Sequence, residues 1–128
     1  MDEKLMKHGA FSWFELMTTD VDASKSFYSK LMNWSIEDMP MENMTYSVVK
    51  VDGNDAGGIM PMPPDAGEMP PAWGLYITVD DVDATAMKAK EMGGKVLVEP
   101  QDIPQVGRFC VIQDPQGAWF SAITYAQP

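Results

Sequence analysis

An apolar run, an acidic tetrapeptide and a helical stretch follow one another twice along the chain. The tetrapeptide Asp-Val-Asp-Ala occupies residues 20–23 and again residues 81–84. Two copies do not make a solenoid, which needs about three or more repeats. At 128 residues the chain has the size of one domain. The repeat therefore predicts a single domain, residues 1–128, made of two similar halves.

The first apolar run, residues 11–18, alternates between two faces as a half-buried strand does. One face carries Phe14 and Leu16 and is predicted to pack under a helix. The other face is mixed, with members Trp13, Glu15 and Met17. A carboxylate within an apolar strand costs free energy unless it meets water or a partner. The mixed face is therefore typical of a cavity wall.

The rest of the first half is predicted to complete the order β-α-β-β-β within residues 11–60. Asp20 is expected to cap a helix over residues 24–33 by accepting from backbone N–H groups. An apolar stripe at helical spacing is formed by Val21, Phe27, Tyr28 and Leu31. Strands are expected at residues 34–38, 44–51 and 55–60, with a hairpin turn at Asp52-Gly53-Asn54.

Residues 61–72 contain five prolines and separate the two halves. Proline neither donates to a sheet nor continues a helix, so this segment is predicted to be an extended linker. An alternative is a lid over a pocket mouth. The second half, residues 73–125, repeats the order of the first. Its predicted elements are a strand at 73–79, a helix capped by Asp80 or Asp81 and ending at Met92, and strands at 95–99, 107–113 and 118–125.

Charge and composition narrow the choice of partner. The net charge of −10 argues against nucleic acid and against an anionic membrane, which would repel the chain. No apolar run is long enough to cross a bilayer, so no membrane span is predicted. Residues 1–7 are charged and lack an apolar signal core, so a cytoplasmic location is expected.

Two single residues have ordinary interpretations. Cys110 is the one cysteine and lies in an apolar run, which is typical of a small core residue. His8 is the one histidine and precedes the first strand, so it is interpreted as a surface or capping residue.

The order of the motifs resembles the vicinal oxygen chelate superfamily, the glyoxalase, bleomycin-resistance and extradiol-dioxygenase fold. The matching residues are Glu15-Leu16, Asp20-Val21, Ser26-Phe27-Tyr28, Leu31, Trp34, Tyr76, Val79, Asp81-Val82-Asp83, Gly93-Gly94 and Asp114-Pro115-Gln116-Gly117. The resemblance implies an α+β fold of two βαβββ modules, whose sheets form a cupped, incomplete barrel around a ligand cavity. It also implies a homodimer, since many members are homodimers.

The resemblance places the family's metal ligands, usually His, Gln or Glu, at four inward positions. In this chain three of them are Trp13, Gly74 and Ser121, and the fourth falls near residues 58–60. A divalent metal ion needs several nitrogen or oxygen ligands that converge on it. Tryptophan and glycine do not supply them. No metal and no other cofactor is therefore expected at the family site.

The constant offset between the two copies predicts which side chains line the cavity. The predicted ligand-binding residues are Trp13, Glu15, Met17, Gly74, Tyr76, Thr78, Trp119, Ser121 and Ile123. Aromatic walls with a few polar groups are typical of a small-molecule site. Glu15 and Tyr76 form the one plausible acid–base pair within this set. The simpler interpretation is that Glu15 accepts from Tyr76 or another neighbouring donor and holds the strands in register.

Two functional hypotheses follow. The first is a metal-free protein that binds a small apolar or aromatic molecule. The second is an enzyme of the same superfamily, a lyase, isomerase or dioxygenase. It would use Glu15 as a base, because an apolar wall raises the pKa of a carboxylate, or it would carry a relocated metal site.

Overall fold

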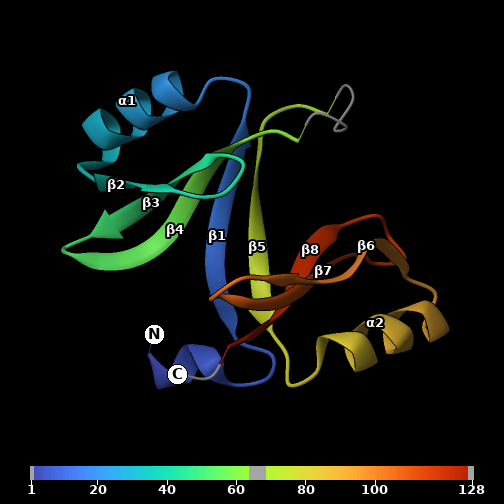
Figure 1. Ribbon diagram of the computed structural model, residues 1–128. Helices are drawn as coiled ribbons and strands as arrows, with labels where there is room; N and C mark the ends of the chain where they lie inside the picture. Colours follow the sequence, from blue (N-terminus) through green and yellow to red (C-terminus); the bar gives the residue numbers. More distant parts are fainter. Residues whose placement is uncertain (1, 64–68, 127–128) are drawn as a thin grey trace. The chain divides into compact units, whose positions relative to one another are not determined.

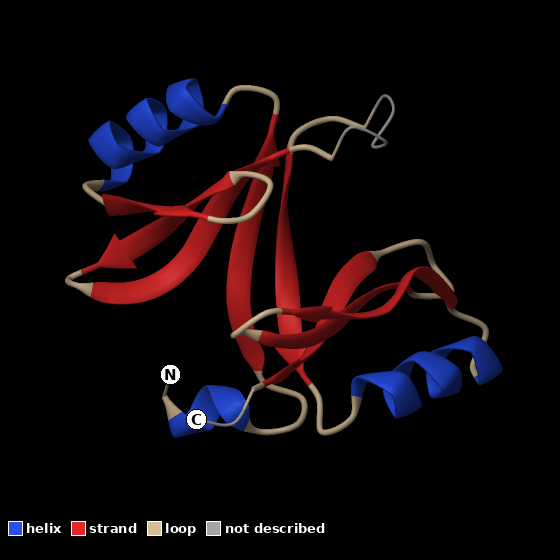
Figure 2. Cartoon of the chain, viewed as in Figure 1, coloured by secondary structure: helices blue, strands red, loops and turns tan. Residues whose placement is uncertain are grey.

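The computed structural model describes residues 2–63 and 69–126, and both predicted βαβββ modules are present (Figures 1 and 2). The first half contains β1 (Phe11–Thr18), α1 (Val21–Met32), β2 (Ser35–Pro40), β3 (Thr45–Val51) and β4 (Asn54–Pro61). The second half contains β5 (Ala72–Thr78), α2 (Val82–Glu91), β6 (Lys95–Ile103), β7 (Gly107–Gln113) and β8 (Trp119–Tyr125). A short 3-10 helix, η1 (Glu3–Met6), precedes β1.

Each half uses the same strand order. In the first half the order is β2-β3-β4-β1, and in the second it is β6-β7-β8-β5. The three strands after the helix form an antiparallel meander in each half, and the last of them lies parallel to the first strand. Glu15 pairs with Gly58 in the first parallel pair, and Tyr76 pairs with Ser121 in the second.

The repeated tetrapeptide caps both helices in the same way. The Asp20 side chain accepts a hydrogen bond from the Ala23 backbone N–H, and Asp81 accepts from Ala84, each at 3.0 Å. These bonds satisfy amide groups that have no partner within the helix. Because Asp20 is the cap, α1 begins at Val21, earlier than the predicted start at residue 24. Between the two capping residues proposed for α2, the structure selects Asp81.

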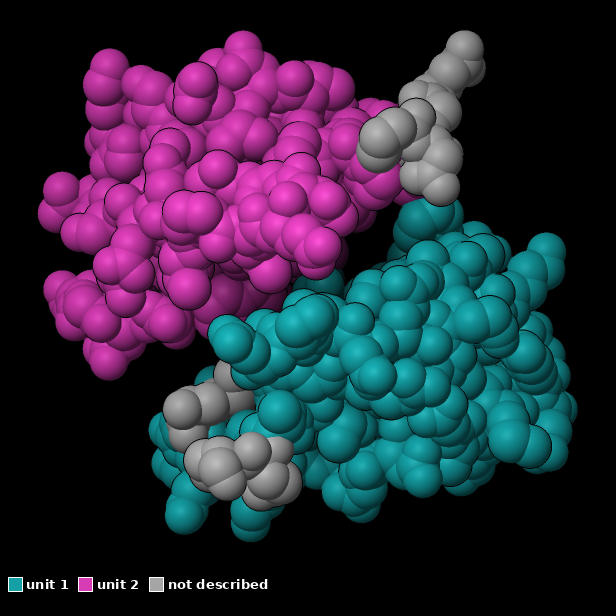
Figure 3. Space-filling model, in the orientation of Figure 1, with its two compact units in different colours: residues 1–12, 75–128 teal, residues 13–74 magenta. Residues whose placement is uncertain are grey.

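The described chain falls into two compact units, whose boundaries differ from those of the sequence repeat (Figure 3). One unit contains residues 13–74, and the other contains residues 1–12 and 75–128. The start of β5 thus belongs to the first-half unit, and the N-terminal arm belongs to the second. Thr78 fixes this arm, because its backbone pairs with Gly9 and Ala10 and its hydroxyl donates to the Leu5 carbonyl oxygen.

The side chain of His8 also fixes the N-terminal arm to the second half. Its Nδ1 atom accepts a hydrogen bond from the Asp80 backbone N–H at 3.0 Å, while the imidazole stays largely exposed. The interpretation of His8 as a surface capping residue is confirmed.

The core of the first half lies between α1 and its sheet. Leu16, Val49 and Ile59 are buried there, and Val21, Tyr28, Trp34 and Ile36 pack against them. The predicted apolar stripe of α1 is only half right, because Phe27 and Leu31 are each 59% exposed. The predicted burial of Phe14 is also wrong in part, since 45% of this residue is accessible. Apolar surface of β1 and of α1 therefore stays exposed in the first half.

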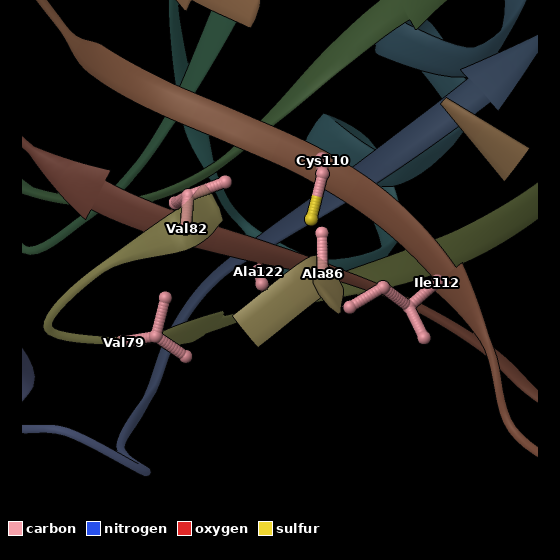
Figure 4. Close-up of a cluster of buried hydrophobic side chains, with 6 residues drawn as sticks. All are labelled: Val79, Val82, Ala86, Cys110, Ile112 and Ala122. Atoms are coloured by element: carbon pink, nitrogen blue, oxygen red, sulfur yellow. The ribbon is translucent and has the colours of Figure 1, made fainter. Parts of the chain in front are cut away.

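The core of the second half consists of small and branched apolar side chains (Figure 4). Its buried members are Val79, Val82, Ala86, Cys110, Ile112 and Ala122. Cys110 is fully buried, which confirms its interpretation as a core residue, and burial raises the pKa of its thiol. No helix in the described part of the chain is long and apolar enough to cross a membrane. The lid alternative for the linker falls partly on residues 64–68, outside the described residues.

Candidate functional site

The mixed face of β1 lies opposite the helix-covered core of the first half. Leu16 points into that core, so its neighbours in the strand point the other way. Glu15 lies beside Gly58 of β4, and Gly58 lies beside Val48 of β3, so these positions share one face. Tyr46 lies two residues before Val48 in β3, so it belongs to the same face.

Three side chains form a hydrogen-bond network on this face. The Trp13 indole Nε1–H donates to the Tyr46 hydroxyl oxygen at 2.9 Å. The Tyr46 hydroxyl donates in turn to Glu15 Oε1 at 2.8 Å. The second bond ends on a carboxylate, and charge-assisted bonds of this kind are stronger than neutral ones. All three side chains are partly buried. We call this the Trp13–Tyr46–Glu15 network, and the side of the sheet that carries it the network face.

Gly58 makes room for the network. Tyr46 lies on β3 and Glu15 on β1, so the tyrosine ring must reach over the intervening strand β4. A Cβ atom built at residue 58 would collide with the Tyr46 ring and its hydroxyl. A glycine at this position therefore lets the phenol cross the strand and meet the carboxylate.

Sequence reasoning missed Tyr46 and found its two partners. The alternation of β3 contains the signal, because Tyr46 and Val48 share a face while Ser47 and Val49 point to the core. The register of β3 against β4 is needed to place Tyr46 beside Glu15, and a bulge between Val49 and Lys50 shifts that register. Gly57 and Gly58 indicate a bulge or turn in β4, but the sequence pattern does not determine the register that results.

The other first-half candidates lie near the network. Met17 is half-buried and lies in register with Met60. Gly74 lies at the start of β5, exposed, and a Cβ there would come no closer than 3.9 Å to the Glu15 carbonyl oxygen.

The second-half candidates share the face opposite the α2 core. Tyr76 lies in register with Ser121, and its ring lies 6.5 Å from that of Phe109 between centroids. Trp119 is 47% exposed, whereas Thr78 and Ile123 are buried, each 3% exposed. The arm covers Thr78, whose hydroxyl bonds to Leu5. Glu15 and Tyr76 belong to different units, and their pairing stays a prediction.

The side chains predicted at the family's metal positions are poor metal ligands by their chemistry. Trp13 commits its N–H to Tyr46, an indole has no lone pair for coordination, and Gly74 has no side chain. Ser121 is the one oxygen-bearing side chain among Trp13, Gly74 and Ser121. Within residues 2–63 and 69–126, no group of three or more His, Cys, Asp or Glu side chains is arranged to hold a metal ion.

Known proteins share this sequence pattern. Residues 10–122 match the model of the Glyoxalase/Bleomycin resistance protein/Dioxygenase superfamily. Over 115 residues the chain is 43% identical to the protein named "Putative glyoxylase CFP32" of Mycobacterium tuberculosis. Over 126 residues it is 32% identical to the anthracycline biosynthesis protein DnrV of Streptomyces peucetius. Each match covers 88% of this chain but 44% and 46% of these relatives, so the chain spans less than half their length.

Solved structures share the fold. A variant of methylmalonyl-CoA epimerase from Streptomyces coelicolor, in complex with 2-nitronate-propionyl-CoA, matches with a TM-score of 0.70. The match covers 94% of this chain and 100% of the epimerase chain, at 18% sequence identity. This likeness confirms the predicted α+β class of two βαβββ modules, and the family model confirms the resemblance seen in the sequence. The chain belongs to the Glyoxalase/Bleomycin resistance protein/Dioxygenase superfamily.

Proposed function

We propose that the chain binds a small apolar or aromatic molecule on the network face, without a metal ion at the family's four positions. The observation that carries this proposal is the Trp13–Tyr46–Glu15 network, which fixes two aromatic rings and one carboxylate on a face turned away from the core.

The network suits a flat ligand with one or two donor groups. Trp13 and Tyr46 use their polar hydrogens within the network, so their rings are held in place and offer apolar surface. A side chain that is already ordered loses less entropy when a ligand binds. The Glu15 carboxylate has several acceptor positions, so it can accept from a ligand hydroxyl or amide besides Tyr46.

The names of the matched proteins guide the choice of compounds. DnrV is named for anthracycline biosynthesis, and the epimerase structure holds a CoA ester. A thermal-shift screen should therefore include polycyclic aromatic compounds and CoA thioesters, with EDTA present throughout. Compounds that bind the native state raise the melting temperature.

The matched test of the face compares Trp13→Ala with Phe27→Ala. Both variants remove an aromatic side chain from the first half, but Phe27 lies on α1 and is 59% exposed. Loss of the Trp13 ring should weaken the best compound of the screen about tenfold or more, since stacking and burial are both lost. Phe27→Ala should leave the affinity unchanged. Equal effects of the two variants would refute the assignment of the face.

The metal-free part of the proposal has its own test. Purified protein would be exposed to zinc, nickel, iron and manganese, desalted and submitted to elemental analysis. Less than about a tenth of an equivalent of each metal is expected, because the family positions lack a converging set of donors. One retained equivalent would instead favour a dioxygenase or lyase with a relocated site.

A metal-independent lyase or isomerase is the second candidate, and the orientation of Glu15 favours it. A catalytic base is usually oriented by a third group, and the Tyr46 hydroxyl holds Glu15 in this way. Glu15→Gln separates the two functions. Retained ligand affinity with lost turnover would support catalysis, and a more stable variant with full function would exclude a base role for Glu15.

A further inference from the structure

An aromatic pocket lies on the opposite side of the first-half sheet from the network. Its volume is about 300 Å³, and its lining residues are Phe14, Trp34, Val49, Ala56, Gly57 and Trp73. Val49 belongs to the buried core under α1, and Phe14 alternates with Trp13 and Glu15 along β1. The pocket is therefore separate from the network face, although β1 contributes to both. Its volume lies at the lower end of the range for small-molecule sites.

Two indole rings form a corner of this pocket. The rings of Trp34 and Trp73 lie 6.0 Å apart between centroids, with their planes at 83°. Tyr28 stabilises both, because it stacks on Trp34 at 5.5 Å and meets Trp73 edge-on at 5.4 Å. Trp73 Nε1–H also donates to the Tyr28 hydroxyl oxygen at 3.1 Å. The corner is thus held by ring contacts and by a hydrogen bond.

The lining indicates what the pocket can hold. None of its six residues is ionisable, so a charged group placed there would lose water without gaining a partner. A flat ring placed in a right-angled corner can stack on one indole and meet the other edge-on, and both geometries are favourable. Trp73 is 42% exposed and Phe14 is 45% exposed, so the pocket is open to solvent.

We propose that this pocket is a second binding site, for an uncharged, flat aromatic compound of about two fused rings. The site goes beyond the proposed function, because it lies on the other side of the sheet and uses none of the network residues.

The neutral fluorescent compound N-phenyl-1-naphthylamine is a direct probe of this site. Its emission rises in apolar surroundings, and it accepts excitation energy from nearby tryptophan. We expect saturable binding with energy transfer from tryptophan. Trp73→Ala and Phe14→Ala should each weaken this binding about tenfold or more, because each removes one aromatic wall. Both residues are substantially exposed, so neither substitution should prevent folding. Trp73→Phe should restore most of the affinity, since it keeps a ring at this position.

A variant of the network face distinguishes binding in the pocket from binding on the network face. The probe binding that Trp73→Ala weakens should keep its affinity in Trp13→Ala, and any probe that the network face takes up would appear as a separate component that Trp13→Ala removes. Probe binding that is lost in Trp13→Ala and retained in Trp73→Ala would overturn the second site. The absence of saturable probe binding would also overturn the second site. If sedimentation then showed a dimer that Trp73→Ala dissociates, the pocket would be a contact between two copies of the chain.

Discussion

The two halves share a backbone plan and differ in what they enclose between helix and sheet. Asp20 and Asp81 cap their helices with the same geometry, and both halves place their last strand parallel to their first. In the second half, Ala86 of α2 and Cys110 of β7 pack in an apolar core between the helix and the sheet (Figure 4).

The corresponding positions of the first half are polar. The repeat aligns Lys25 with Ala86, and the shared strand pairing aligns Ser47, the partner of Ile59, with Cys110, the partner of Ala122. Both polar side chains bind Asp38: Lys25 Nζ lies 2.8 Å from Oδ2, and the Ser47 hydroxyl donates to Oδ1 at 2.7 Å. These hydrogen bonds hold the pKa of Asp38 below its usual value.

The helix side chains differ in size between the two halves. Tyr28 of α1 stands where α2 has Ala89, and it supports the cluster with Trp34 and Trp73. Ala86 and Ala89 pack in the apolar core of the second half. In the first half, Trp34 and Trp73 of the ring cluster line a pocket. The residues that repeat thus determine the helix caps and the strand pairing. Binding chemistry depends on the positions where the two halves differ.

The largest expected effect concerns the shared parallel pairing of β1 with β4. A Cβ atom at Gly57 would collide with the Phe14 backbone carbonyl, and a backbone atom moves only with its strand. Gly57→Ala should lower the free energy of unfolding by more than about 3 kcal/mol, measured by denaturant unfolding. Gly74→Ala is the control, because a Cβ there would make only an ordinary contact with the Glu15 carbonyl oxygen at 3.9 Å, and its effect should stay within about 0.5 kcal/mol. Similar effects for both glycines would contradict the strand register.

The apolar core of the second half predicts a smaller loss of stability for a polar substitution. Cys110→Ser introduces the hydroxyl that Ser47 has at the aligned position of the first half. Ser47 donates to Asp38, whereas the buried cluster around Cys110 consists of apolar side chains. A poorly satisfied buried hydroxyl should cost about 1–2 kcal/mol of unfolding free energy. Cys110→Ala, which adds no polar group, is the matched control. If the serine variant is as stable as the alanine variant or more stable, the core offers the hydroxyl a hydrogen-bond partner, which would contradict an apolar core.

The network face can be altered without removing any of its three members. In Gly58→Ala the new methyl group displaces the Tyr46 ring, so the hydrogen bonds to Trp13 and Glu15 are broken. Tyr46→Phe removes the same hydroxyl directly. Each variant should lower the unfolding free energy by about 1 kcal/mol and weaken ligand binding on this face. A fully functional, equally stable Tyr46→Phe variant would show that the network has no role.

The smallest effect is the pH dependence of the Lys25–Asp38 pair. Because the pKa of Asp38 is lowered in the folded state, the pair stabilises the chain above the unfolded pKa of about 4. This contribution is lost as the pH falls through the lowered pKa. The Asp38 side chain is 49% exposed, so the loss should be under about 1 kcal/mol. Asp38→Asn should flatten the stability curve in this acidic range and leave it unchanged elsewhere. An unaltered acid slope would contradict the assignment.

Much of the fold could be predicted from the sequence, because the repeat and the capping residues act locally. The bounds of β1 agree with prediction, and α1 begins three residues earlier than predicted. Tyr46 could not be placed, since its position depends on pairing across β4 and on a bulge. The exposure of Phe14 and Phe27 also depends on how far α1 covers its sheet. Properties of this kind arise from long-range packing.

The proposed function requires that the network face bind its ligand without a metal ion. Calorimetric titration of the best screening compound into wild-type protein, with and without EDTA, tests it directly. We predict the same affinity in both buffers, and an affinity about tenfold or more weaker for Trp13→Ala under each condition. Binding that disappears in EDTA and returns with one equivalent of a divalent metal would contradict the account.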